Sequence, residues 1–431
     1  MISVPNHQRL SSGNSLLITL CSVLLLSCNA FKVVSNDQPD IPENSKPTVA
    51  VDSSNEVNTG SVDADPKNKP ADMMQVVDFF GEEYQVAPHK TQFKVALILP
   101  FYFDASTDAE KKRSDYMLEY YQGVKLALND LELFGLNLKL YIYDDEGSTS
   151  KLQSILGKQM MRQMDVIIGS VGENQMNMVS SFGLKNDIPV ISPITGISSL
   201  GNPNPKLYST TPSNEVKSSA VASYIKTKYK DKKIFLVSDK GRYANEAIVF
   251  CKEQLSKAGL KCQELESKTS VFQSELSKDD SSIVIVLSHN PSFVNRTLSS
   301  IYQTKQDVMV FGENSWSSFH DNDYKFWNKL QVHLVASDFV NDTMPSVRNF
   351  RLNFRLQNKV DPGVYAYLGY DQFRFMGEYL LAFGEHFPEY INNKEFRYLS
   401  SNFHYEYQNG LNQNTNVFLL KFENYTLRPV K

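Results

Sequence analysis

From Phe93 onward the chain alternates short apolar segments with longer segments of helical periodicity, and this alternation constrains the fold more than any other feature. The segment KVALILPF (94–101) has strand length and no polar residue after its lysine, as expected for a strand covered on both faces. Four successive strand–helix units predict a parallel, doubly wound α/β sheet. The segments that carry this pattern after KVALILPF are YMLEYYQGVKLALNDL (116–131), LNLKLYIYDDEG (136–147), KLQSILGKQMMRQM (151–164), DVIIGS (165–170), NQMNMVSSFGLKND (174–187) and PVISPIT (189–195).

The same alternation begins again after a segment rich in Ser, Thr and Pro, KLYSTTPSN (206–214). Two helices are expected at 346–358 and 365–384, and the tail from Phe396 is β-like. We therefore predict an α/β fold of two doubly wound, parallel-sheet lobes that follow one another. The second series comprises SAVASYIKTKY (219–229), KKIFLVSD (232–239), NEAIVFCKEQLSKAG (245–259), LKCQELE (260–266), SSIVIVLSH (281–289), QDVMVFGE (306–313) and VHLVASDFV (332–340).

The N-terminus has the pattern of an export signal. Arg9 provides a basic flank, and the apolar run 16–26 is too short for the roughly 20 residues of a membrane span but suits a signal peptide. The run ends Leu-Leu-Ser-Cys at Cys28, which resembles the bacterial lipobox, whose cysteine is acylated and becomes the mature N-terminus. We predict a signal peptide at 1–27 and a lipid anchor on Cys28. The protein would then lie on the periplasmic side of the cell envelope, held to the inner or outer membrane through its anchor only.

A disordered polar tether is predicted at 28–90. From Asn29 to about Gln75 the chain is rich in Asn, Asp, Ser, Pro and Lys and has few large apolar residues. Such a segment cannot bury enough surface to offset its chain entropy. About 60 residues would reach roughly 40–45 Å as a coil and on the order of 200 Å when extended.

Composition and motifs favour neither nucleic-acid binding nor catalysis. The net charge of −4 gives no basic field for nucleic acid. No P-loop, GxGxxG, GxSxG or HExxH pattern occurs in the expected context, and the histidines are scattered, so we predict no enzyme, no cofactor and no metal. The pair Asp144-Asp145 is most simply an exposed strand end. Cys251 and Cys262 could form a disulfide or remain two thiols, because their spacing does not fix their distance.

Polar residues gather where the predicted strands end. Open α/β sheets bind ligands outside the carboxyl ends of their strands. Free N–H groups at a helix N-terminus suit an anion such as a carboxylate, whereas Glu313 and Asp239 could take a cation such as an amino group. Ordinary turn and cap usage explains each residue singly, so the prediction rests on the set. The strand-end segments are 169–174 and 192–196 in the first lobe, and 238–243, 288–290 and 312–314 in the second.

These residues resemble the type 1 periplasmic binding proteins, the branched-chain amino acid receptors of ABC importers. SDKGRYANEAIVFCKEQLSKAGLK (238–261) is similar to their second-lobe unit, which begins Asp-Lys-x-x-Tyr-Gly. DVIIGSVGENQ (165–175), PVISPIT (189–195) and YLGYDQFRFMGEYLLAFG (367–384) fall, in order, where that family has its ligand strand, its Ile-Ser-Pro strand end and its Tyr-Asp helix.

The resemblance implies two lobes joined by a three-strand hinge, closing on a ligand. Hinge crossings would fall near 208–212, near 337–341 and after Gly384. The first lobe would comprise 91–211 and 341–385, and the second 212–340 and 386–431. Ligand contacts carried over from the family would be Ser170, Glu173, Asn174, Thr195, Gly196, Tyr243, Ser288, His289, Glu313 and Asn314.

The sequence departs from the family at two of these places. Glu173-Asn174 stands where amino acid receptors usually offer small hydroxyl residues, and Ala244 replaces the Gly after Tyr243. An acidic group repels a carboxylate unless it is paired, which leaves the ligand open beyond branched-chain amino acids. Two explanations fit the aromatic residues near the strand ends, a larger site for a sugar or peptide and ordinary packing. They are Phe101, Tyr102, Phe103, Trp316, Phe319 and Trp327.

Two functions are compatible with these features. The first is a lipid-anchored solute-binding protein that closes on a small amino acid or peptide-like ligand and delivers it to an ABC permease. The second is an outer-membrane lipoprotein that regulates a cell-wall enzyme through the same fold, which the long tether would serve.

Overall fold

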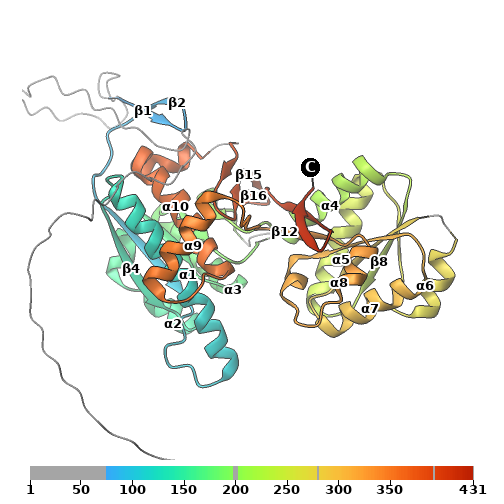
Figure 1. Ribbon diagram of the computed structural model, residues 1–431. Coiled ribbons are helices and arrows are strands. Elements are labelled where there is room, and N and C mark those ends of the chain that lie inside the picture. The colour runs from blue at the N-terminus through green and yellow to red at the C-terminus, as the bar shows by residue number, and fades with distance from the viewer. Residues whose placement is uncertain (1–73, 198–201, 279–280, 392–393, 431) are drawn as a thin grey trace, which may run out of the picture. The chain divides into compact units, whose positions relative to one another are not determined.

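The computed structural model describes residues 74–197, 202–278, 281–391 and 394–430, which form two parallel-dominated sheets flanked by helices (Figure 1). We call each sheet with its helices a lobe. The predicted α/β class with two doubly wound sheets is confirmed. The first sheet runs, in spatial order, β15 (Tyr405–Gln408), β16 (Leu411–Asn414), β7 (Leu207–Ser209), β6 (Val190–Ser192), β5 (Val166–Gly169), β3 (Phe93–Leu99) and β4 (Leu138–Asp144). The second runs β18 (Thr426–Pro429), β17 (Phe418–Glu423), β12 (His333–Ala336), β11 (Val308–Glu313), β10 (Ser282–Leu287), β8 (Lys233–Ser238) and β9 (Cys262–Glu264).

Both lobes use the same strand order. Taken in chain sequence, the five parallel strands of each sheet lie in the order 2-1-3-4-5, as β4-β3-β5-β6-β7 and β9-β8-β10-β11-β12. The order reverses between β3 and β5 and between β8 and β10. Ligands of open α/β sheets bind at such switch points, outside the carboxyl ends of the strands.

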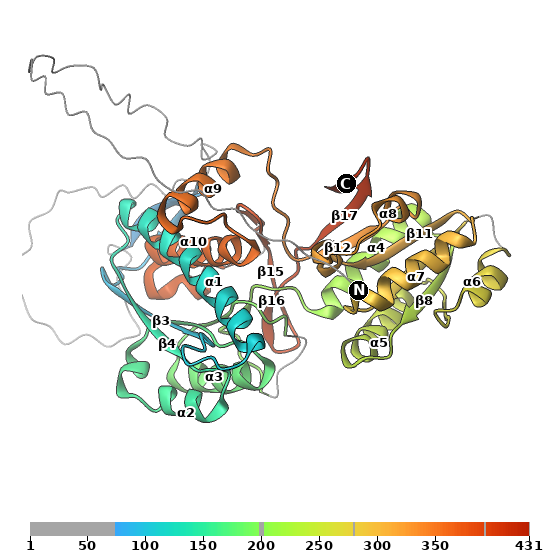
Figure 2. The same cartoon turned by 60° about the horizontal axis from the view of Figure 1, so that its bottom comes forward.

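Alternate residues of β3 enter two separate cores. Val95, Leu97 and Leu99 face the core under α1 (Asp108–Leu133) and α10 (Val364–Phe383), whereas Ala96 and Ile98 face the core under α2 and α3 (Figure 2). Because β3 is buried on both faces, its residues from Val95 onward are apolar at every position, and this continuous apolar run is the feature from which the strand was predicted. The remaining helices of this lobe are α2 (Thr149–Leu156), η3 (Gln159–Gln163), α3 (Glu173–Asn186), α9 (Pro345–Asn358) and η5 (Gly384–Glu389).

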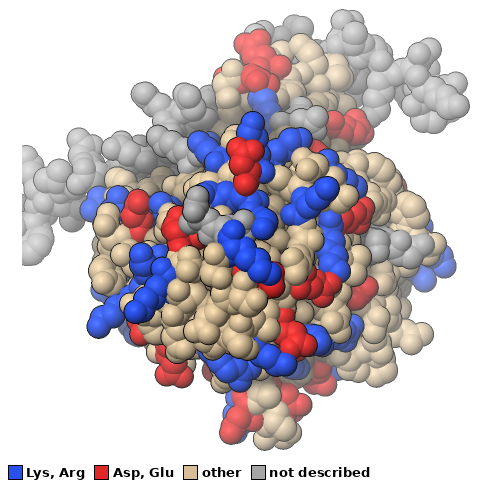
Figure 3. Space-filling view, turned by 90° about the vertical axis from the view of Figure 1, so that its right-hand side faces the viewer, with Lys and Arg blue, Asp and Glu red and all other residues tan. Residues whose placement is uncertain are grey.

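The second lobe is covered in the same way. Leu236 and Ile285 face α4 (Asn214–Tyr229) and α5 (Arg242–Lys257), and Val237 and Val286 face the opposite core. The face of this lobe that Figure 3 shows carries both basic and acidic side chains. Ion pairs at the surface of the lobe include Lys257–Glu253 at 2.8 Å and Lys278–Glu275 at 2.6 Å. The opposite core is closed by α6 (Thr269–Leu276), α7 (Pro291–Gln303), η4 (Asn314–Ser318) and α8 (Tyr324–Lys329).

The predicted tether at 28–90 is wrong at its C-terminal end. Residues 75–86 form an antiparallel hairpin of β1 (Gln75–Phe79) and β2 (Glu82–Val86) that packs on the first lobe. Phe79 is 1 % exposed and lies 4.8 Å, centroid to centroid, from both Tyr379 and Phe383. Burial of Val77 and Phe79 on one face of the strand supplies the apolar surface that a tether lacks.

The expected boundary after Gly384 is also corrected. Residues 386–391 and 394–414 stay with the first lobe, since Phe387, Phe396 and Phe403 enter the core around Tyr379, and β16 pairs in parallel with β7. The chain therefore crosses between the sheets after β7, after β12 and after β16, and the third crossing lies at about 415–417. The short sheet of β13 (Phe396–Arg397) and β14 (Asn402–Phe403) belongs to the same part.

Several predictions concern residues outside the described ranges. The signal peptide at 1–27, the anchor on Cys28 and the tether up to residue 73 belong to this group. In the ranges that are described, no helix has the length and apolar character needed to cross a bilayer. Both Cys251 and Cys262 are free thiols, which resolves that alternative.

Candidate functional site

Three residues named from the sequence meet at the carboxyl ends of the second-lobe strands. Tyr243 lies in the first turn of α5, after β8, and its hydroxyl donates to Glu313 Oε1 at 2.7 Å. Glu313 ends β11 and is 8 % exposed, so its carboxylate needs partners. His289, just after β10, places its ring against that of Tyr243 with 3.8 Å between centroids. Burial, and then the Glu313 charge, raise the pKa of Tyr243, so its hydroxyl keeps the proton that it donates.

Lys217 completes this cluster and was missed by the sequence reasoning. Its Nζ lies 3.4 Å from Glu313 Oε2, and the two side chains are only 18 % and 11 % exposed. Ser213 caps α4 by accepting from the N–H of Val216, which places Lys217 in the first turn or so of that helix. A cation near a helix N-terminus opposes the helix dipole, so the pair with Glu313 offsets an unfavourable position. The sequence signal that could have identified Lys217 is a lysine near the start of a predicted helix that directly follows a hinge segment.

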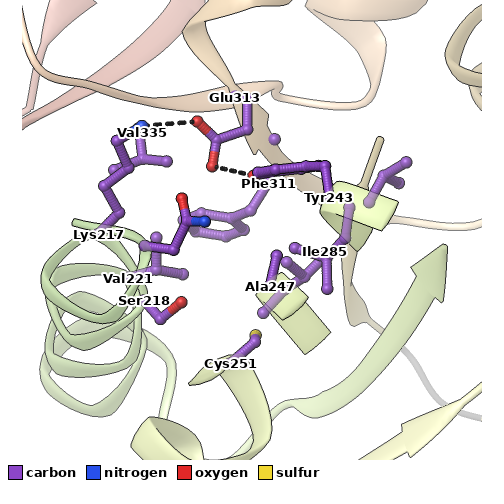
Figure 4. Close-up of a pocket in the computed structure, with 14 residues that line it drawn as sticks. Lys217, Ser218, Val221, Tyr243, Ala247, Cys251, Ile285, Phe311, Glu313 and Val335 are labelled. Carbon is purple, nitrogen blue, oxygen red and sulfur yellow. Dashed lines mark hydrogen bonds and ion pairs between the residues drawn. The ribbon is translucent and has the colours of Figure 1, made fainter. Parts of the chain in front are cut away.

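The chain Lys217–Glu313–Tyr243 forms a polar bridge above a small apolar cavity (Figure 4). The cavity measures about 30 Å³, which admits a water or two but no organic ligand. A ligand of this lobe would therefore lie on the bridge and not beneath it. The cavity is lined by the bridge residues and by Asn214, Ser218, Val221, Ala247, Cys251, Ile285, Val286, Leu287, Phe311, Gly312 and Val335.

Ser288 and Asn314 lie beside this cluster but have structural partners. Ser288 is fully buried; its hydroxyl donates to Asp239 Oδ2 at 2.6 Å, and its carbonyl accepts from the indole N–H of Trp316 at 2.9 Å. The Ser288–Asp239 bond thus joins the ends of β10 and β8 across the switch point. Asn314 is half-buried at the start of η4, and its carbonyl accepts from the Ser317 hydroxyl.

The first-lobe residues form a similar strand-end network. Ser170 is fully buried and its hydroxyl donates to Asp145, which is itself fully buried and not the exposed strand end that we expected. Burial raises the pKa of Asp145, and hydrogen bonds from Ser170 and from the N–H of Gly147 oppose that rise. Thr195 accepts from the N–H of Gly172 at 3.1 Å.

The remaining first-lobe candidates lie at the start of α3. Glu173 and Asn174 are exposed in its first turn, and the N-cap Gly172 provides no side-chain cap. The N–H groups of that turn are therefore open to a ligand, although the Glu173 carboxylate competes for them. Gly196 is exposed, and a Cβ there would lie 2.7 Å from the carbonyl oxygen of Pro212, so the close approach of the hinge segment requires glycine.

The aromatic residues near the strand ends mostly pack. Trp316 and Trp327 are 0 % and 1 % exposed in the second-lobe core, and Phe319 packs against it. Phe101 is also buried, whereas Phe103 is 68 % exposed and stacks on it at 5.4 Å. The packing explanation therefore holds for four of the six, whereas Tyr102 is half-buried and Phe103 is exposed.

A larger polar hollow of about 390 Å³ lies elsewhere, along α4, α5 and β15. It is lined by Glu215, Gln254, Lys257, Glu406 and Gln408 among others. None of the residues that line it is among the strand-end residues named from the sequence, so we place the candidate site at the Lys217–Glu313–Tyr243 bridge. Over the described part of the chain, no three His, Cys, Asp or Glu side chains are grouped to hold a metal ion.

Comparison with known proteins places this geometry in context. The family described as the receptor family ligand binding region matches residues 121–403, which is more than half of the chain. No curated protein matches the sequence.

Solved structures share the fold at low sequence identity. A putative branched-chain amino acid ABC transporter protein from Rhodospirillum rubrum aligns with a TM-score of 0.61 and 11 % identity, over 79 % of this chain and 100 % of that one. An ABC transporter substrate-binding protein from Desulfitobacterium hafniense, in complex with Leu, gives 0.54 and 14 %, over 79 % and 100 %. A solute-binding protein of an ABC transporter from R. palustris, in complex with benzoate, gives 0.51 and 17 %, over 79 % and 95 %.

Proposed function

The chain belongs to the receptor family ligand binding region, a family of ligand-binding proteins and not of enzymes, and on that premise we propose that it is an extracytoplasmic solute receptor. Its two lobes would close on a small organic molecule that carries a carboxylate. The observation that carries this proposal is the convergence of Lys217, Glu313, Tyr243 and His289 at the carboxyl ends of the second-lobe strands.

The first lobe supports a carboxylate ligand. The uncapped first turn of α3 offers N–H groups at the positive end of the helix dipole. The Thr195 hydroxyl, which accepts from the N–H of Gly172, keeps its own proton to donate. Leucine and benzoate, bound by two of the structurally similar proteins, both contain a carboxylate.

Not all of the residues named from the sequence remain proposed contacts. The side chains of Ser170 and Ser288 are fully buried and already bonded to aspartates, so we assign them to the scaffold. We keep the exposed and half-buried residues as ligand contacts, together with the buried Glu313 at the centre of the bridge, and add Lys217. The retained set is Glu173, Asn174, Thr195, Gly196, Tyr243, His289, Glu313 and Asn314.

The anchor and the partner complete the proposal. A lipid on Cys28 would hold the receptor to a membrane, from which it would deliver its ligand to an ABC permease. The lipobox-like sequence supports the anchor, and the ABC transporter proteins among the similar structures support the partner. Regulation of a cell-wall enzyme from the outer membrane is the outcome that the test below would favour if no small ligand binds.

A thermal-shift screen of the full chain against amino acids, organic acids and short peptides tests the function. A ligand at 100 times its dissociation constant stabilises the folded state by about 2.7 kcal/mol. We expect Tyr243→Ala and Glu313→Ala to weaken the response at least tenfold while the apoproteins stay folded. Tyr407→Ala, at a residue 56 % exposed on β15, serves as the control. Absence of stabilisation by the whole panel at millimolar concentration would refute the receptor function.

A further inference from the structure

Both oxygens of Glu313 already have a partner within the protein. Its Oε1 accepts from the Tyr243 hydroxyl at 2.7 Å, and its Oε2 lies 3.4 Å from the Lys217 ammonium. Figure 4 shows the three side chains in one row, with Glu313 in the middle. An amino group brought by a ligand could reach only the remaining lone pairs of these oxygens, and it would lie beside Lys217, a second, partly buried cation. The single negative charge of Glu313 would then be shared by two cations, and these two like charges repel.

The other acidic groups nearby offer an amine little compensation. Asp239 accepts from the Ser288 hydroxyl and from the N–H of Gly241 at 2.8 Å, so both of its oxygens already bind groups of the strand-end loops. Asp338, which follows β12 and interacts with Lys217, is half-buried and accepts from the Ser337 hydroxyl at 3.2 Å. Burial raises the pKa of Asp338, and Lys217 is already a cation that interacts with it.

The remaining hydrogen-bonding capacity of the bridge suits an oxygen ligand. An ammonium has three donors, and Lys217 uses one of them on Glu313. Lys217 therefore has N–H donors and a positive charge to offer a carboxylate, keto or hydroxyl oxygen. The Tyr243 hydroxyl donates its one hydrogen bond to Glu313, so it can offer a ligand only an acceptor. A carboxylate on the ligand meets one cation here, whereas an amine meets only a carboxylate whose charge Lys217 already balances.

We infer that Lys217 determines the specificity of the site: it takes the place of a ligand amino group, so the receptor selects organic acids without an α-amino group over the corresponding amino acids. This inference rests on the proposed receptor function and narrows its ligand class. It assigns Lys217 a role of direct ligand contact.

Matched pairs of ligands that differ only in the amino group test the inference. The probes are leucine with 4-methylpentanoate, phenylalanine with 3-phenylpropanoate, and benzoate alone, titrated calorimetrically into the full chain. We expect at least one of the organic acids to bind, and at least tenfold more tightly than the amino acid of its pair. In Lys217→Met, Glu313 loses its cationic partner, so the amino acid of each pair should bind at least tenfold more tightly than the organic acid. Lys226→Met, on the same helix, is the control and should leave the preference of the wild type unchanged.

A second variant covers the case in which Lys217→Met leaves Glu313 buried without a partner and unfolds the lobe. Lys217→Met combined with Glu313→Gln removes both charges and should abolish the discrimination within each pair while the protein stays folded. Tighter binding of the amino acids to the wild-type chain would overturn the inference and leave the receptor function standing. So would amino acid binding that survives in Lys217→Met but is lost in Asp338→Asn, because the amine would then lie on Asp338. Binding of no probe and of no compound in the broader screen would refute the receptor function and the inference with it.

Discussion

Replacement of Gly123 by alanine should separate two helices that touch at backbone distance. Gly123 lies in α1, and a Cβ there would be 2.0 Å from the carbonyl oxygen of Ala366 in α10. Gly369 of α10 is the reciprocal contact, since its Cβ would lie 2.1 Å from the carbonyl oxygen of Tyr120 in α1. Contacts of a Cβ below about 3 Å are essentially never seen, so the axes would have to move apart by about 1 Å. Neither obstacle is a flexible side chain that could turn away.

The size of the effect follows from two opposing contributions. Overpacking in a well-packed core costs about 1–3 kcal/mol, and two rigid backbones favour the upper end of that range. Alanine in a helix interior returns up to about 1 kcal/mol relative to glycine. We therefore expect Gly123→Ala to lower the free energy of unfolding by about 2 kcal/mol, or the melting temperature by about 4–8 °C for a lobe of this size.

Urea and thermal denaturation, followed by circular dichroism, measure this difference. Gly157→Ala is a matched control, because Gly157 caps α2 with φ −69° and its Cβ would be 3.4 Å from the nearest atom, the carbonyl oxygen of Gln153. The control should be neutral or slightly stabilising. A Gly123→Ala protein as stable as the wild type would show that α1 and α10 are not packed at this distance.

Two further predictions concern the hairpin and a buried histidine. Phe79→Ala should lower the free energy of unfolding by about 3–5 kcal/mol and expose the hairpin to proteases, since it removes a buried ring from the first-lobe core. The control Val76→Ala, at a 46 % exposed residue of the same strand, should have neither effect. Equal melting temperatures for the two variants would show that the hairpin does not pack on the lobe. Burial lowers the pKa of His333 to about 4 from its ordinary 6.5, so the folded state binds fewer protons and loses stability as the pH falls from about 6.5 to about 4, by about 3 kcal/mol at most. Urea titrations at pH 7 and pH 4 give the difference in the free energy of unfolding between the two pH values, and this difference should be smaller in His333→Leu than in the wild type. An equal difference in the two proteins would show that His333 does not cause the loss.

The sequence predicted the fold well because each strand carries its own signal. β10 and β11 are buried at every residue, and their unbroken apolar runs are what a strand covered on both faces requires. The helix at 365–384 was expected from its apolar periodicity and is found at Val364–Phe383, buried on nearly all sides. Such local patterns need no knowledge of distant residues.

The boundaries failed where local signals were weak. The short strands β13 to β16 contain polar residues and do not show which sheet they join. Their place with the first lobe depends on Phe387, Phe396 and Phe403 meeting Tyr379, a contact between segments that the sequence does not relate. The hairpin at 75–86 was assigned to the tether for the same reason, because its few apolar residues become significant only against α10.

The candidate site divides in the same way. By itself the sequence determined that polar residues follow the strands, and so that Tyr243, His289 and Glu313 would lie at one edge of a sheet, because the carboxyl ends of parallel strands share that edge. Only the tertiary structure decided their state: Ser170 and Ser288 are buried against aspartates, and Lys217, 96 residues before Glu313 in the chain, supplies the cation. Burial and ion pairing arise from side chains that folding brings together from separate elements, so no local pattern encodes which groups remain free for a ligand.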